Sequence, residues 1–185
     1  AFLNPKLSHL KATELLPEMD IAVERILHAM DRKERIVLYG DYDVDGVSSL
    51  ALLAHFLREC GSEVRCFLPR RATEGYGLSM AALGRCLDDH SPRLLLAVDC
   101  GTNSYAEISR LKDKGVDVIV LDHHEPSGPR PPCVALVNPK CGPDFHYLCS
   151  AGVAFKFAHA IIKKRPKSHI DLRGYLDLVA LATIA

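Results

Sequence analysis

Short apolar runs alternate along the chain with stretches of helical periodicity, and this alternation constrains the fold more than any other feature. The apolar runs lie at 35–40, 63–69, 93–101, 116–124 and 133–139. The helical stretches lie at 19–30, 47–60, 78–90, 104–115, 151–165 and 172–185. Because the runs are apolar throughout instead of alternating, both faces of their sheet must be covered. The pattern predicts an α/β fold, doubly wound, with a mainly parallel five-stranded sheet and helices on both faces.

Length and composition set the class of protein. The chain has 185 residues, enough for one ordinary core, and no linker divides it, so we expect one domain over 1–185. Lys+Arg and Asp+Glu each number 23, and this balance gives no support for non-specific nucleic-acid binding. Seven cysteines without a C-x-x-C pair favour free thiols in a reducing compartment. No run is long enough to span a membrane, and the first ten residues lack a signal-peptide pattern. We therefore expect a cytoplasmic protein.

Residues 39–46 read YGDYDVDG and place Asp41, Asp43 and Asp45 at every second position. In an extended segment such side chains project to the same side, so these carboxylates would repel one another. An acidic turn is the simple explanation, since Asp and Gly are common in turns. A divalent cation between the carboxylates is the other explanation. For Asp41 we favour a helix N-cap or a supporting role behind the ligands.

Two more strand ends carry polar side chains. Asp99 follows LLLAV, and Asp122, His123 and His124 follow VDVIVL. Ligands of parallel α/β sheets bind at the carboxyl ends of the strands, so three such ends together favour a site over three separate helix caps. Carboxylates with a few imidazoles suit Mn²⁺ or Mg²⁺ better than a closed zinc site. A cluster this acidic predicts two ions about 3.5–4 Å apart, as in many phosphoryl-hydrolysing enzymes.

The stretches YGDYDVDGVSS, EGYGLS, VDCGT, LDHH and LCSAGVAFKF resemble the DHH phosphoesterase superfamily and, within it, the RecJ-type single-strand-specific exonucleases. The resemblance runs from FLNP to the last residue. It implies a metal-dependent phosphodiesterase that removes nucleotides from single-stranded DNA in the 5′→3′ direction, in recombination and repair. It further implies contacts with a single-strand-binding protein and a helicase.

The resemblance also implies roles for individual ligands. Asp43 matches an aspartate on one metal ion, and Asp45 matches one on the second ion. Asp99 matches the aspartate that bridges the two ions, and His123 matches a histidine ligand.

Two further residues match the catalytic part of the motif. His124 matches a histidine close to the scissile phosphate. Asp122 would orient the histidines, because ligand imidazoles are themselves usually hydrogen-bonded.

Basic and helix-start residues are candidates for contact with substrate phosphates. Arg70 and Arg71 follow the second strand and suit bidentate phosphate binding; a solvated pair of loop residues is the alternative. Ser150 and Gly152 open a helix whose free N–H groups would bind a phosphate, and packing of the helix start is the equal alternative. Tyr76, between two glycines, is a candidate for stacking on a base.

Two departures from the family pattern bear on activity. Tyr39 stands where some members carry a ligand histidine. The family segment that resembles the ending ATIA continues into a further aspartate ligand, one residue beyond Ala185. From these features we expect a fragment that lacks the next motif and the second domain, and that is weakly active or inactive as a nuclease.

Two other functions stay open. One is a phosphodiesterase of small substrates, such as oligonucleotides or cyclic dinucleotides, which EGYGLS disfavours. The other is a catalytically silent scaffold in the replication machinery, which is disfavoured by retention of the ligand set: Asp43, Asp45, Asp99, His123 and His124.

Overall fold

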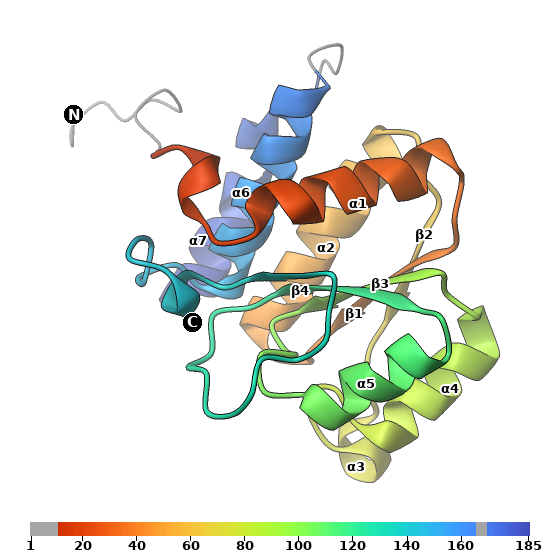
Figure 1. The fold of residues 1–185 in the computed structure, drawn as a ribbon. Coiled ribbons are helices and arrows are strands. Elements are labelled where there is room, and N and C mark those ends of the chain that lie inside the picture. Colours follow the sequence, from red (N-terminus) through yellow and green to blue (C-terminus); the bar gives the residue numbers. More distant parts are fainter. Residues whose placement is uncertain (1–10, 166–169) are drawn as a thin grey trace.

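The computed structural model describes residues 11–165 and 170–185. The FLNP motif and the expectation that the chain has no signal peptide both concern the first ten residues, which lie outside the described part. One sheet contains β1 (Ile36–Gly40), β2 (Val64–Phe67), β3 (Leu94–Val98), β4 (Asp117–Leu121) and β5 (Ala135–Val137). Its strand order is β2-β1-β3-β4-β5, and every neighbouring pair is parallel (Figure 1). The predicted five-stranded α/β sheet is confirmed, and it is wholly parallel.

Helices cover both faces of this sheet. They are α1 (Met19–Asp31), α2 (Val44–Glu59), α3 (Arg71–Glu74), α4 (Met80–His90), α5 (Tyr105–Asp113), α6 (Ser150–Lys164) and α7 (Leu176–Ile184). Short 3₁₀ turns are η2 (Thr13–Leu15), η3 (Pro139–Cys141) and η4 (Leu172–Tyr175). Helices α1, α2 and α6 lie on one face with α7 against α2 and α6, whereas α4 and α5 lie on the other (Figure 1).

Alternate side chains of one strand enter two separate cores. Ile36 and Leu38 of β1 join the core beneath α1, α2 and α6, whereas Val37 and Tyr39 join the core beneath α4 and α5. The strand is buried on both sides, which is why its sequence is apolar without alternation. Full burial of one such aliphatic side chain contributes about 1.5–3 kcal/mol.

The strand order brings the polar strand ends together. The chain leaves β1 for the edge strand β2 and returns to β3 on the other side of β1, which makes a switch point between β1 and β3. Ligands of doubly wound sheets bind at such a point. The acidic stretch after β1, Asp99 after β3 and the Asp-His-His stretch after β4 are therefore neighbours at one edge.

The acidic stretch turns into a helix earlier than predicted. Helix α2 begins at Val44, so Asp45 lies in its first turn and the three aspartates do not share one extended segment. Asp43, and not Asp41, is the N-cap: its Oδ1 accepts the Gly46 N–H at 2.8 Å. A Cβ at Gly46 would lie 2.6 Å from the Asp41 carbonyl oxygen, so the tight turn requires glycine.

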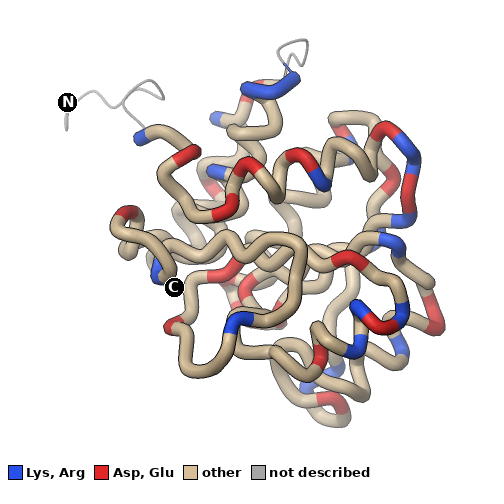
Figure 2. Tube along the Cα trace, in the orientation of Figure 1, with Lys and Arg blue, Asp and Glu red and all other residues tan. Residues whose placement is uncertain are grey.

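The surface carries both signs of charge. In Figure 2 basic and acidic segments alternate along α1 and around α4 and α5, in line with the equal numbers of the two. Among the described residues, no helix has the length and apolar character needed to cross a bilayer.

Candidate metal centre at the carboxyl edge of the sheet

One imidazole lies between two carboxylates at the switch point. His123 Nε2 is 3.5 Å from Asp45 Oδ2 and 3.5 Å from Asp99 Oδ1. These side chains come from three different places: the stretch after β4, the first turn of α2 and the end of β3. The structure thus brings together three of the four residues that were predicted as metal ligands.

The N-terminus of α6 holds Asp45 in place. Backbone N–H groups of Ser150 and Ala151 donate to the two Asp45 carboxylate oxygens at 2.7 and 2.8 Å. The first N–H groups of a helix have no partner within the helix and carry a partial positive charge, so an aspartate is a favourable partner there. The carboxylate of Asp45 is therefore fixed by an element that lies far away in the sequence.

Asp99 is the most enclosed acid of this edge after Asp122, with 2% of its surface exposed. Its φ of +60° is uncommon for a residue other than glycine and costs of the order of 1–3 kcal/mol. The Ser150 hydroxyl donates to its Oδ1 at 2.8 Å. Burial, together with the charges of Asp45 and Asp43, raises the pKa of Asp99 to about 6.

The other two aspartates of the acidic stretch have local partners. Asp41 Oδ1 accepts the Tyr42 N–H at 2.7 Å, whereas Asp43 uses one carboxylate oxygen as the N-cap of α2. Asp43 is exposed and close enough for its charge to raise the pKa of Asp99. Its role as a ligand to a metal ion stays a prediction.

His124 is held by a buried acid. Its Nδ1 lies 2.7 Å from Asp122 Oδ1, and Asp122, only 1% exposed, also accepts N–H groups of His123 and Thr102 at 2.8 and 3.0 Å. Burial would raise the pKa of Asp122, but the hydrogen bonds from His124 and Thr102 outweigh it and hold the pKa at about 2. The Asp122 carboxylate raises the pKa of His124 to about 9. The Nδ1 atom therefore carries the hydrogen, and Nε2 is left for a different partner.

This donor set fits a divalent cation. Asp99, His123 and, in its neutral form, His124 can each offer one ligand atom such that all three atoms lie within 4.8 Å of one another. Across residues 11–165 and 170–185, no Lys or Arg forms an ion pair with Asp43, Asp45 or Asp99. Clustered carboxylates without a basic partner need positive charge from another source, and carboxylate with imidazole suits Mn²⁺ or Mg²⁺.

One of the two predicted phosphate-binding arginines, Arg71, lies beside the acidic stretch. The Arg71 guanidinium sits 4.9 Å from the centre of the Tyr42 ring, which places it near the site. The side chain of Arg70 is exposed, while its backbone N–H donates to Glu74 Oε2 at 2.7 Å. Glu74 also accepts from Arg85, so the segment that carries both arginines is tied to α4.

The two donors of Ser150 are directed to carboxylates and not to a substrate phosphate, whereas the predicted phosphate contact of Gly152 stays a prediction. Ser150 donates its N–H to Asp45 and its hydroxyl to Asp99, so both donors are already used. A Cβ at Gly152 would lie 2.9 Å from Leu148 Cδ2, and this supports the packing alternative.

Tyr39, the departure from the family pattern, supports a neighbouring loop. Its hydroxyl donates to the Gly77 carbonyl at 2.9 Å, and its ring stacks on Phe67 with centroids 5.2 Å apart. The loop that it holds carries Tyr76, which is 78% exposed. Burial raises the pKa of the Tyr39 hydroxyl, so it stays protonated and acts as a donor.

Sequence reasoning missed two buried polar residues behind the histidines. Asn138, fully buried after β5, donates through Nδ2 to Thr102 Oγ1 at 2.8 Å and to the His124 carbonyl at 2.9 Å. Thr102 in turn donates its N–H to Asp122. The signal was present, since Asn138 is a polar residue at the carboxyl end of a parallel strand, as Asp99 is.

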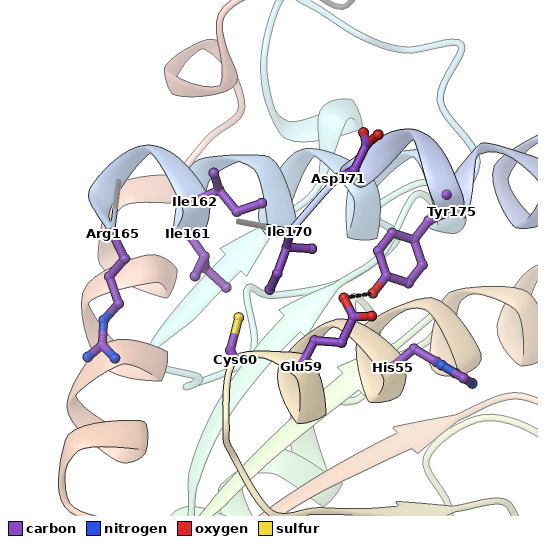
Figure 3. A pocket seen from close by; sticks show the side chains of 10 residues that line it. His55, Glu59, Cys60, Ile161, Ile162, Arg165, Ile170, Asp171 and Tyr175 are labelled. Atoms are coloured by element: carbon purple, nitrogen blue, oxygen red, sulfur yellow. Dashed lines mark hydrogen bonds between the residues drawn. The ribbon is translucent and has the colours of Figure 1, made fainter. Parts of the chain in front are cut away.

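A cavity of about 820 Å³ lies elsewhere, between the C-terminal parts of α2 and α6 and the turn before α7 (Figure 3). Within it the Tyr175 hydroxyl donates to Glu59 Oε2 at 2.6 Å. Glu59 ends α2, whereas the acidic edge lies at the start of that 16-residue helix, about 24 Å away at 1.5 Å per residue. The cavity is therefore separate from the candidate metal centre.

Comparison with known proteins shows which chains this one resembles. Residues 35–183 match the DHH family, N-terminal domain. The chain is 39% identical over 170 residues to the single-stranded-DNA-specific exonuclease RecJ of Bacillus subtilis, covering 90% of this chain and 21% of that protein. It superposes on the exonuclease RecJ bound to manganese with a TM-score of 0.84 at 35% identity, covering 95% of this chain and 45% of the other. For RecJ from Thermus thermophilus in complex with Mn²⁺ the TM-score is 0.80 at 33% identity, with 99% and 26% covered. The chain thus spans less than half the length of these relatives.

Proposed function

The chain belongs to the DHH family, and from that membership and its acidic sheet edge we propose that it is the catalytic core of a metal-dependent nuclease. The observation that carries the proposal is the position of His123 Nε2, 3.5 Å from both Asp45 and Asp99. Neighbouring strands deliver these groups to the switch point of the sheet, where a ligand is expected.

We assign the ions to the carboxylates and imidazoles of this edge. Asp43, Asp45, Asp99 and His123 would hold two Mn²⁺ or Mg²⁺ ions, with Asp99 shared between them. Bound ions of this kind would lower the pKa of a water molecule and attract the phosphoryl oxygens. The likeness to RecJ structures that contain manganese supports this assignment.

Residues of the chain itself would position the substrate and donate a hydrogen bond to it. Asp122 keeps a hydrogen on Nδ1 of His124, and in the metal-free protein its carboxylate raises the pKa of the imidazole to about 9. His124 Nε2–H would then donate to an oxygen of the scissile phosphate. Arg71, beside Tyr42, would contact a neighbouring phosphate, and the exposed ring of Tyr76 would stack on a base.

The substrate and biological role rest on the relatives. We propose hydrolysis of single-stranded DNA in the 5′→3′ direction, because the relatives are named as single-stranded-DNA-specific exonucleases. A role in recombination and repair in the cytoplasm, with a single-strand-binding protein and a helicase as partners, belongs to the same proposal and is supported by family likeness.

A nuclease assay on the protein that carries this chain tests the proposal. Substrates labelled at either end, as single strands, duplexes and short oligonucleotides, are incubated with Mn²⁺ or with a chelator. Asp99→Asn and the exposed Asp88→Asn serve as the inactivating and control variants. We expect metal-dependent release of nucleotides from the 5′ end of single strands by the wild type and Asp88→Asn.

Other outcomes point to the alternatives. Hydrolysis of short oligonucleotides or cyclic dinucleotides alone would replace the exonuclease with a small-substrate phosphodiesterase. Absence of any hydrolysis in folded, metal-loaded protein would favour a catalytically silent scaffold.

A further inference from the structure

We propose that Asn138 is a positioning residue that fixes His124, acting through the Thr102–Asp122 pair and through the His124 carbonyl. This inference rests on the proposed function and adds a residue to it that touches neither metal nor substrate. The contacts of the Asn138 amide within the described part of the chain are all with uncharged groups, so the effect depends on hydrogen bonds alone.

Asn138 uses its whole amide group to join three loops. The two Nδ2 hydrogens go to Thr102 Oγ1 at 2.8 Å and to the His124 carbonyl at 2.9 Å. The Oδ1 atom accepts the Lys140 N–H at 2.8 Å. These partners follow β3, β4 and β5, so one side chain ties together the ends of three adjacent strands.

The chain of contacts reaches the imidazole in two ways. One route runs from the Asn138 amide to the Thr102 hydroxyl, and the backbone N–H of the same threonine donates to Asp122 Oδ2 at 3.0 Å. Asp122 Oδ1 then lies 2.7 Å from His124 Nδ1. Through the backbone, Asn138 holds the carbonyl of His124 itself. The amide thus binds the peptide of His124 directly and reaches its ring only through Thr102 and Asp122.

Burial makes the loss of any of these hydrogen bonds costly. Asn138, Thr102 and Asp122 are 0%, 3% and 1% exposed, so water does not readily replace a lost partner. Removal of the amide leaves the Thr102 hydroxyl and the His124 carbonyl without the donor that now binds them. We expect the His124 ring to become more mobile, because the backbone carbonyl of His124 loses its hydrogen bond.

A neighbouring asparagine supplies a matched control. Asn103 donates from Nδ2 to the Glu125 carbonyl at 2.9 Å and accepts the Ser127 N–H at 2.7 Å. It therefore joins the loops after β3 and β4 with the same chemistry, but its partners lie beyond the two histidines, and it is exposed. A purely structural link between these loops would make the two asparagines similar in effect.

The experiment compares Asn138→Ala, Asn138→Asp, Thr102→Val and Asn103→Ala with the wild-type chain. Nitrogen-15 NMR of the imidazoles in metal-free protein reports the Nδ1–H of His124 and its exchange with solvent. Calorimetric titration with Mn²⁺ reports affinity, and a thermal melt reports stability. Asn138→Asp keeps the size and the acceptor for Lys140 but lacks both donors, so it serves as the second variant if Asn138→Ala does not fold.

We expect faster exchange of the His124 Nδ1 hydrogen in both Asn138 variants. The increase should be smaller in Thr102→Val, which loses the hydrogen bond from Asn138 to the Thr102 hydroxyl but keeps the one to the His124 carbonyl. We expect Mn²⁺ affinity to fall about 10-fold or more in the Asn138 variants, because the Asp122 carboxylate that Asn138 supports also accepts the backbone N–H of the proposed ligand His123 at 2.8 Å. Asn103→Ala should leave both readouts at the wild-type value. Wild-type exchange of the His124 hydrogen in folded Asn138→Asp would overturn the inference, whatever its melting temperature.

The two proposals fail separately. If the wild type binds no Mn²⁺, the proposed function fails, while the NMR comparison in metal-free protein still decides whether Asn138 positions His124. If Mn²⁺ binds and Asn138→Asp behaves like Asn103→Ala in both readouts, the metal centre stands and the role of Asn138 is rejected.

Discussion

Asp45 Oδ2 accepts the backbone N–H of Ser150 at 2.7 Å, although the two residues are 105 positions apart in the chain. The same serine donates its hydroxyl to Asp99 at 2.8 Å. One residue at the start of α6 thus contacts two of the proposed metal ligands, which come from different elements. Ser150 therefore supports two proposed metal ligands, whereas the sequence had suggested that it binds a substrate phosphate.

Ser150→Ala tests that role. The substitution removes the hydroxyl contact with Asp99 and keeps the backbone contact with Asp45, so we expect Mn²⁺ affinity to fall about 10-fold with the fold retained. Ser79→Ala is the control, because the Ser79 hydroxyl caps α4 by accepting the Ala82 N–H and binds none of the proposed metal ligands. That variant should lose about 1 kcal/mol of stability and no metal affinity. Titration calorimetry and thermal melts distinguish the two, and equal affinity losses would contradict the assignment.

Gly46→Ala tests the tight turn that places the acids. A Cβ there would meet the backbone oxygen of Asp41 at 2.6 Å, and backbone cannot move aside easily. We expect a loss of about 1–3 kcal/mol in the free energy of unfolding, measured in urea.

Gly84→Ala is the matched control for that substitution. Gly84 lies inside α4, and a methyl group added there would have no neighbouring atom within 4 Å outside its own helix, so alanine should stabilise the helix by about 0.5–1 kcal/mol. If both glycine variants gained stability, the close approach at Gly46 would not exist in solution.

The buried charge of Asp99 predicts a pH dependence of stability in metal-free protein. Its pKa in the folded state, about 6, lies above the ordinary value of 3.8, so its contribution to stability is present below pH 3.8 and is lost as pH rises through 6. Asp99→Asn lacks this charge and should lose less stability over that interval. Urea unfolding of both proteins at about pH 4 and about pH 7.5 measures the difference. If both proteins lost the same free energy of unfolding between these pH values, the buried charge of Asp99 would not be destabilising.

Some of the site could be predicted from the sequence because it follows from the sheet alone. Asp99 and His123 come at the ends of apolar runs, and parallel strands bring such positions to one edge. Asp45 meets them because the acidic stretch follows β1, which lies beside β3.

Other features depend on contacts that no local pattern encodes. The pairing of Ser150 with Asp45 and Asp99 requires knowledge of where α6 begins relative to α2. The early start of α2 follows from the cap at Asp43 and the close approach at Gly46, which an extended conformation of the acidic stretch does not anticipate. Asn138 was missed because its partners lie in two other loops, although its position after β5 follows the same strand-end rule.

The most direct test of the central claim, a divalent cation held between Asp45, Asp99 and His123, is a titration of this chain with Mn²⁺ followed by calorimetry and thermal melting. We predict that Mn²⁺ binds the wild type and Asp88→Asn with equal affinity and raises their melting temperatures. We also predict that Asp99→Asn binds Mn²⁺ at least about 10-fold more weakly. Wild-type affinity in Asp99→Asn, or no binding to the wild type at millimolar Mn²⁺, would contradict the claim.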